Sequence, residues 1–105
     1  MVLLRFADER IKKDIEKLQK KDIKLYNQIL NAFENIKEDP ACGIKIPQRL
    51  IPADWKKKFE IDNLYKYNLL NGWRLFYSLI GNEIELIAII LKCLSHPEYE
   101  REFNY

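Results

Sequence analysis

The chain has 105 residues, which is enough for one folded domain with a real core but excludes a separate cofactor domain beside a substrate domain. Hydrophobic residues make up 48% and charged residues 32% of the composition, which excludes a disordered chain. The net charge is only +2, from 18 Lys and Arg against 16 Asp and Glu, so a site for a polyanion must arise from local clustering.

Cysteine spacing and hydropathy narrow the class further. Cys42 and Cys93 form neither a CxxC pair nor a Cys/His ligand spacing, which argues against a zinc site and a disulfide framework and fits a reducing compartment. No apolar run approaches the roughly 20 residues of a membrane span, and the first apolar run is too short for a signal peptide. We therefore expect a single cytoplasmic domain over residues 1–105.

The first part of the chain predicts a helical hairpin. Residues 2–6 are either a short edge strand or the lead-in to a helix, and Asp8 and Asp22 are candidate N-caps of two successive helices. The second helix should end at Pro40, which cannot continue it. The apolar stripes of the two helices are Ile11, Ile15 and Leu18, and then Tyr26, Ile29, Leu30, Phe33 and Ile36.

Residues 41–59 predict an irregular, basic segment. Pro47 and Pro52 interrupt it, and residues 52–59 could add a helical turn. Between residues 45 and 59 only Asp54 is acidic, and Trp55 supplies an aromatic plane, so the segment suggests a surface that faces phosphate. Alternatively, the lysine run is an ordinary solvated turn and Trp55 a core residue. The cations concerned are Lys45, Arg49, Lys56, Lys57 and Lys58.

From residue 64 the apolar period changes to two, which predicts antiparallel strands. Asn71-Gly72 favours a two-residue turn that would set Leu69 opposite Arg74. The same register sets Tyr67 opposite Phe76 and Tyr65 opposite Ser78. Trp73, Leu75, Tyr77 and Leu79 would then form the floor for the helices, with Arg74, Phe76 and Ser78 on the other face.

A second turn at Gly81-Asn82 would set Arg74 opposite Ile89 and lead into a strand over residues 84–91. Apart from Glu85 that strand is a long apolar run, which predicts a strand covered on both faces. Ser95 and Glu98 then have capping-box spacing, so a short helix should run to about Phe103.

Three polar side chains converge near this exit: Arg74, His96 and Tyr99. The sequence pairs no Ser or Cys nucleophile with a base, so the reaction that suits this set is metal-free cleavage of RNA by its own 2′-OH. Histidine can move the protons, arginine binds phosphate, and tyrosine can donate a hydrogen bond or stack on a base. Each residue also has a structural explanation: His96 as a surface residue, Arg74 as a partner of Glu85, and Tyr99 as a packing residue.

The order of a helical hairpin, a basic segment, NGWRLFYSLIG and IELIAIILKCLSHPEYEREF resembles the RelE/ParE superfamily of bacterial and archaeal toxins, in particular its RelE-like branch. The resemblance implies a toxin that cuts mRNA on the ribosome and is held inactive by a cognate antitoxin. It also implies catalytic roles for Arg74, His96 and Tyr99. RNA-binding cations would come from Lys45, Arg49, Lys56 and Lys58.

We therefore expect an α+β fold in which an N-terminal helical hairpin packs on a small, mostly antiparallel twisted sheet, followed by a short C-terminal helix. The expected activity is endoribonuclease cleavage without metal or cofactor. Two rival interpretations keep the fold: a ParE-like toxin that poisons DNA gyrase, and a noncatalytic module that binds nucleic acid or a partner.

Overall fold

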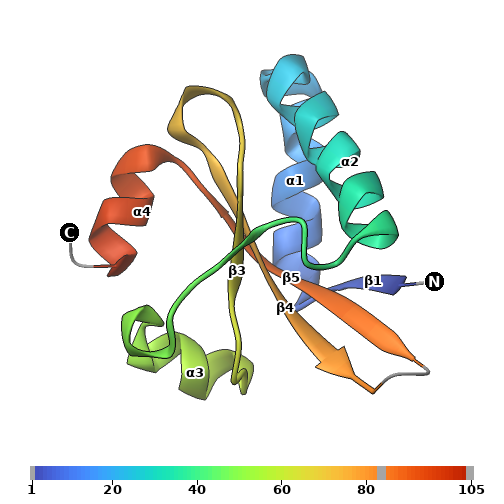
Figure 1. The fold of residues 1–105 in the computed structure, drawn as a ribbon. Helices are drawn as coiled ribbons and strands as arrows, with labels where there is room; N and C mark the ends of the chain where they lie inside the picture. Colours follow the sequence, from blue (N-terminus) through green and yellow to red (C-terminus); the bar gives the residue numbers. More distant parts are fainter. Residues whose placement is uncertain (1, 83–84, 104–105) are drawn as a thin grey trace.

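The computed structural model describes residues 2–82 and 85–103 as an α+β domain built around a five-stranded sheet (Figure 1). Along the chain the elements are β1 (Val2–Phe6), α1 (Glu9–Lys21), α2 (Ile23–Glu38), β2 (Ile44–Lys45), η1 (Gln48–Leu50), α3 (Ala53–Phe59), β3 (Tyr65–Asn68), η2 (Leu70–Gly72), β4 (Arg74–Gly81), β5 (Leu86–Leu94) and α4 (His96–Phe103). This arrangement confirms the predicted fold class.

The strands lie in the order β1-β5-β4-β3-β2. β1 runs parallel to β5, and the other neighbouring pairs are antiparallel. Residues 2–6 are therefore an edge strand, and the sheet is mostly antiparallel, as expected. β4 lies in the middle and β5 beside it, so the residues that connect or follow these two strands are held by the best-supported part of the sheet.

The helical hairpin covers one face of the sheet. Asp8 accepts a hydrogen bond from the backbone N–H of Ile11 at 2.9 Å, and Asp22 accepts one from Leu25 at 3.2 Å, so both predicted N-caps are confirmed. The core under the hairpin consists of Val2, Ile15, Leu25, Ile29, Ala32, Phe33, Ile36, Leu75, Tyr77, Ala88 and Ile90. Leu75 and Tyr77 come from the predicted floor of β4.

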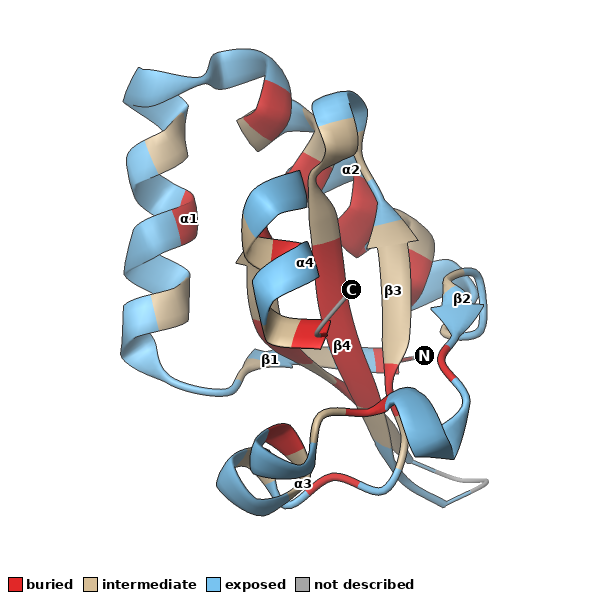
Figure 2. Cartoon of the chain, turned by 90° about the vertical axis from the view of Figure 1, so that its left-hand side faces the viewer, coloured by how far each residue is buried: buried red, intermediate tan, exposed pale blue. Residues whose placement is uncertain are grey.

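α3 and α4 cover part of the opposite face. Trp55 of α3 is 1% exposed, which assigns it to the core, and its ring meets Phe76 of β4 edge to face. Tyr99 and Phe103 of α4 stack on the same Phe76 ring. Figure 2 shows α4 lying over β4, with its outer side exposed to solvent. Phe76 thus anchors both short helices to the middle of the sheet.

The predicted register of β3 against β4 is wrong by one residue. Arg74 pairs with Asn68 rather than Leu69, Tyr67 with Leu75 rather than Phe76, and Tyr65 with Tyr77 rather than Ser78. The connection is wider than a two-residue turn: the N–H of Leu69 donates to the carbonyl of Trp73 at 2.8 Å. Asn71 at φ 55° and Gly72 at φ 79° both take left-handed conformations within it. As a result Lys66, not Tyr67, shares a face with Arg74.

The predicted register of β4 against β5 is also wrong. Arg74 pairs with Leu94 rather than Ile89, because Gly81 already pairs with Leu86 and a bulge follows Phe76. Ile84, the predicted start of the strand, lies outside the described residues. Glu85 lies beside Asn82 at the far end of β4, so it is not the partner of Arg74. The prediction that this strand is covered on both faces is confirmed by Ile90 on one side and Leu91 on the other.

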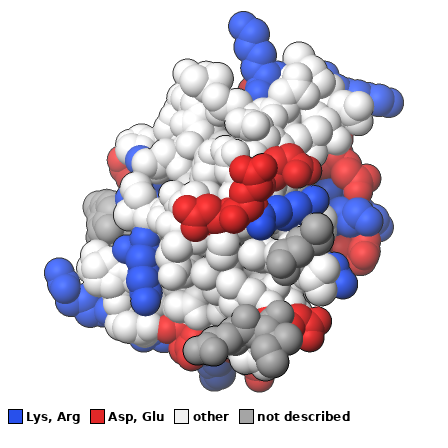
Figure 3. Space-filling view, turned by 45° about the vertical axis from the view of Figure 1, so that its right-hand side comes forward, with Lys and Arg blue, Asp and Glu red and all other residues white. Residues whose placement is uncertain are grey.

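The face that carries α2 and β1 is not a basic surface. Figure 3 shows acidic and basic side chains interspersed there among broad uncharged areas. No helix in the part of the chain that the structure describes is long and apolar enough to cross a membrane.

Candidate nucleic-acid interface

Arg74 and Tyr99 form the centre of the candidate site. Arg74 opens β4, and its guanidinium carbon lies 4.2 Å from the centre of the Tyr99 ring on α4. Tyr99 is only 5% exposed and stacks on Phe76 with ring centres 5.8 Å apart. A cation over an aromatic face is attracted by the quadrupole of the ring. The guanidinium of a half-buried arginine is therefore oriented by a ring that the core holds in place.

His96, three residues before Tyr99 on α4, also contacts Arg74. Its Nδ1 is 3.3 Å from Nη1 of Arg74, and its Nε2 is 2.6 Å from Oε1 of Glu100 one helical turn later. A guanidinium can only donate, so Nδ1 accepts and the ring proton is on Nε2, where it donates to Glu100. Arg74 thus brings His96 and Tyr99 together, as the sequence hypothesis required.

Gly72, in the β3–β4 connection, contacts Arg74 and lies close to His96. Nη1 of Arg74 also donates to the carbonyl of Gly72 at 2.6 Å. A Cβ atom on Gly72 would lie 2.9 Å from Cβ of His96, closer than real Cβ contacts come. Gly72 therefore serves both the left-handed backbone and the close approach of His96. Among the described residues, Nε of Arg74 is buried without a hydrogen-bond partner.

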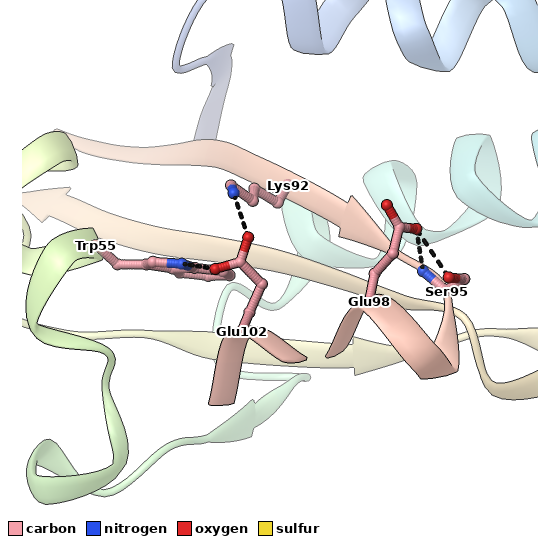
Figure 4. A network of polar contacts seen from close by, with 5 residues as sticks. All are labelled: Trp55, Lys92, Ser95, Glu98 and Glu102. Carbon is pink, nitrogen blue, oxygen red and sulfur yellow. Dashed lines mark hydrogen bonds and ion pairs between the residues drawn. The ribbon is translucent and has the colours of Figure 1, made fainter. Parts of the chain in front are cut away.

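The first turn of α4 is held by a cap. Oε1 of Glu98 accepts from the backbone N–H of Ser95 at 3.0 Å and from its hydroxyl at 2.8 Å, as Figure 4 shows. This confirms the predicted pairing of Ser95 with Glu98. Because His96 directly follows Ser95, the cap fixes the backbone from which the imidazole extends.

Lys66 is the functional candidate that the sequence reasoning missed. It is half-buried on β3, pairs with Phe76, and its Nζ lies 5.5 Å from the centre of the Tyr99 ring. Arg74 and Lys66 therefore share a face and an aromatic neighbour. The predicted register placed Tyr67 opposite Phe76 and so placed Lys66 on the face of the sheet opposite Arg74. The correct length of the β3–β4 connection would have placed Lys66 on the face of Arg74.

The basic segment is spread over several elements. Lys45 pairs with Tyr65, so strand alternation places it on the face of the helical hairpin, opposite Arg74. Arg49 is in η1 and Lys56 and Lys58 are in α3, which packs through Trp55 against Phe103 near the end of α4. Arg74 contacts His96 and Tyr99 in the first half of the same helix, so α3 and its lysines lie toward the other end of α4.

A separate cleft of about 450 Å³ lies between α1, α3 and the ends of β5 and α4. Its walls include Ile11, Trp73, Lys92 and Glu98, but none of Arg74, His96 and Tyr99 lines it. The candidate site around Arg74 is therefore separate from this cleft.

Comparison with known proteins shows a likeness in fold. No protein-family model matches the chain, and no curated protein matches it. Among solved structures, a YoeB/ParE toxin from Agrobacterium tumefaciens superposes with a TM-score of 0.66 at 19% sequence identity. The match covers 90% of this chain and 98% of the toxin. The chain therefore has the fold of the RelE/ParE toxins, as the sequence resemblance implied.

Proposed function

We propose that this protein is the toxin of a toxin–antitoxin system and a metal-independent endoribonuclease that cleaves mRNA, both free and bound to the ribosome. The observation that carries the proposal is the contact of Arg74 with both Tyr99 and His96: its guanidinium carbon lies 4.2 Å from the centre of the Tyr99 ring, and its Nη1 lies 3.3 Å from Nδ1 of His96. A phosphate-binding cation and a proton carrier in contact are the parts that RNA transesterification needs.

In the proposed reaction the 2′-oxygen of the RNA attacks the adjacent phosphorus. A bond forms between the 2′-oxygen and phosphorus, the bond to the 5′-oxygen breaks, and a 2′,3′-cyclic phosphate and a 5′-hydroxyl result. Arg74 stabilises charge on the phosphate oxygens, as guanidinium groups do. Tyr99 orients Arg74, since its buried ring lies against the guanidinium.

His96 would transfer the protons. Its Nδ1 accepts from Arg74 in the absence of RNA. A phosphate is a stronger acceptor for a guanidinium than a neutral imidazole is, so RNA would draw Arg74 away and free Nδ1. That nitrogen could then take the proton of the 2′-hydroxyl or, once protonated, give one to the leaving 5′-oxygen. Glu100 would keep the ring in this tautomer through its 2.6 Å contact with Nε2.

Cations around Arg74 would hold the RNA backbone. Lys66 is nearest to the centre, through its position over Tyr99. Arg49, Lys56 and Lys58 would bind the RNA backbone farther along α4. Lys45 would contact the RNA only where the RNA wraps past the edge of the sheet formed by β2. The proposed partner is an antitoxin that covers this surface, and an acidic one would compete with RNA by charge.

A ParE-like toxin that poisons DNA gyrase is the second candidate, because the similar solved structure is titled as a YoeB/ParE toxin. That function requires a binding surface but no proton transfer, so it gives His96 no special role. Expression would then cause a DNA-damage response while mRNA stayed intact.

The deciding experiment incubates the purified protein with mRNA in the presence of EDTA. We expect fragments that end in 2′,3′-cyclic phosphate, and we expect Arg74→Ala and His96→Gln to abolish them while the circular dichroism spectrum is unchanged. Intact RNA with the unaltered protein, or equal cleavage by both variants, would contradict the proposed catalytic roles.

A further inference from the structure

α4 carries two of the three central residues and packs on β4 through stacked aromatic rings. It is eight residues long, and helices this short are not stable without tertiary contacts. Tyr99 and Phe103 stack on Phe76 at interplanar angles of 12° and 23°, and on each other. Stacked rings attract without fixing one lateral position, so the stacking alone does not set where the helix lies along β4.

The directional contact at the end of α4 is made by Glu102. Its Oε2 accepts a hydrogen bond from Nε1 of Trp55 at 3.1 Å, and its Oε1 accepts one from Nζ of Lys92 at 2.9 Å. Figure 4 shows the carboxylate between the two donors, one from α3 and one from β5. Lys92 also lies over the indole, 5.2 Å from the ring centre. One side chain therefore joins three elements.

Both donors are fixed in place. Trp55 is 1% exposed and is surrounded by Phe59, Phe76 and Phe103 at ring-centre distances of 5.2 to 6.0 Å. Lys92 is half-buried on β5, where it pairs with Phe76. A hydrogen bond to a rigid, buried donor specifies a position, because a shift breaks the bond and leaves a buried N–H unpaired.

We propose that Glu102 is a positioning residue that sets the register of α4 and thereby places Tyr99 against Arg74 and His96 beside it. Glu102 follows Tyr99 by three residues, so the two side chains lie on neighbouring positions of one helix face. The proposal rests on the proposed function for its consequence in cleavage, although the structural part stands without it. Displacements of about 1 Å in a catalytic geometry can lower rates about 100-fold.

The experiment compares Glu102→Gln with Trp55→Phe, which keeps an aromatic ring but removes the N–H. Glu34→Gln is the matched control, since Glu34 forms an ion pair with Lys37 at 3.5 Å on α2, away from α4. The first readout is the nuclear Overhauser effect between the Tyr99 ring and the Arg74 side chain, measured well below the unfolding temperature. It requires no RNA and no activity.

We expect that effect to weaken in Glu102→Gln and Trp55→Phe, with no additive loss in the double variant, and to stay unchanged in Glu34→Gln. The second readout is single-turnover cleavage, which should fall at least about tenfold in both variants while RNA affinity changes less than about twofold. An unchanged Overhauser effect in Glu102→Gln overturns the proposal. If the unaltered protein cuts no RNA, the proposed function fails, and the Overhauser effect still decides whether Glu102 positions α4.

Discussion

The guanidinium carbon of Arg74 lies 4.2 Å from the centre of the Tyr99 ring, and that ring in turn stacks on the fully buried Phe76. The contact joins the first residue of β4 to the first turn of α4, and both elements begin at the candidate site. The orientation of the proposed phosphate-binding group thus depends on the packing of the core beneath it.

Arg74→Lys tests whether the planar guanidinium matters beyond its charge. Lysine keeps the charge but cannot stack on Tyr99 or bind phosphate in two places at once. We expect cleavage to fall about 10²- to 10³-fold, the range seen when one charge-stabilising donor is removed from an active site. Single-turnover assays would measure the cleavage rate. An Arg74→Lys variant as fast as the unaltered protein would show that only the charge of Arg74 matters.

Gly72→Ala tests the contact between the β3–β4 connection and His96. Gly72 has φ 79°, and an added Cβ would lie 2.9 Å from Cβ of His96. We expect a loss of about 1 to 2 kcal/mol in the free energy of unfolding from the left-handed backbone alone.

The matched control for that substitution is Asn71→Gly. Asn71 has φ 55° one residue earlier, where glycine relieves backbone strain rather than adding it. Urea unfolding and the chemical shifts of the His96 ring would measure both effects. A Gly72→Ala protein with unchanged stability and unchanged His96 shifts would show that the connection does not constrain His96.

Lys66→Met tests whether Lys66, which the observed register places on the face of Arg74, binds RNA. In a His96→Gln background, which keeps the RNA intact, we expect weaker RNA binding and a salt dependence of log affinity that is shallower by about 0.7 for the one lost contact with single-stranded RNA. Lys24→Met, on the exposed surface of α2, should leave both quantities unchanged. If log affinity depends equally on salt in the two variants, Lys66 does not contact the RNA.

Glu102 should make stability depend on pH in the acid range. Partial burial alone would raise its pKa, but hydrogen bonds from Lys92 and Trp55 and the charges of Lys92 and Lys58 outweigh burial and lower the pKa below its ordinary 4.5. A lowered folded-state pKa means that the unfolded chain binds the proton more tightly. The stabilisation is therefore fully present above pH 4.5 and is lost as the pH falls through the folded-state value.

Urea unfolding from pH 7 to pH 3 measures this dependence. The difference in unfolding free energy between the unaltered protein and Glu102→Gln should shrink as the pH falls. A difference that stays constant over this range would mean that the Glu102 carboxylate gains nothing from Lys92 and Trp55 in the folded protein.

Local patterns in the sequence were enough to predict several elements. Asp8 and Asp22 mark helix starts because their carboxylates accept hydrogen bonds from backbone N–H groups of the first helical turn. Ser95 marks one because its backbone N–H and hydroxyl donate to Glu98 three residues later. The alternation of β4 identifies its core face because a strand has period two. These signals act within a few residues, so one sequence suffices to read them.

The strand registers could not be read in the same way, because they depend on the length of each turn and on the bulge after Phe76. The one-residue error at Asn71-Gly72 is the reason that Lys66 was missed. Glu102 was missed for a different reason: its donors Trp55 and Lys92 are 47 and 10 residues away in the chain, and only tertiary packing brings them to one carboxylate.

The central claim, that Arg74 and His96 cleave RNA, is tested most directly by mapping mRNA 5′ ends after inducible expression in bacteria. We predict new 5′-hydroxyl ends within coding regions together with growth arrest, and neither with Arg74→Ala or His96→Gln. Growth arrest without new mRNA ends, or the same ends produced by both variants, would contradict the account.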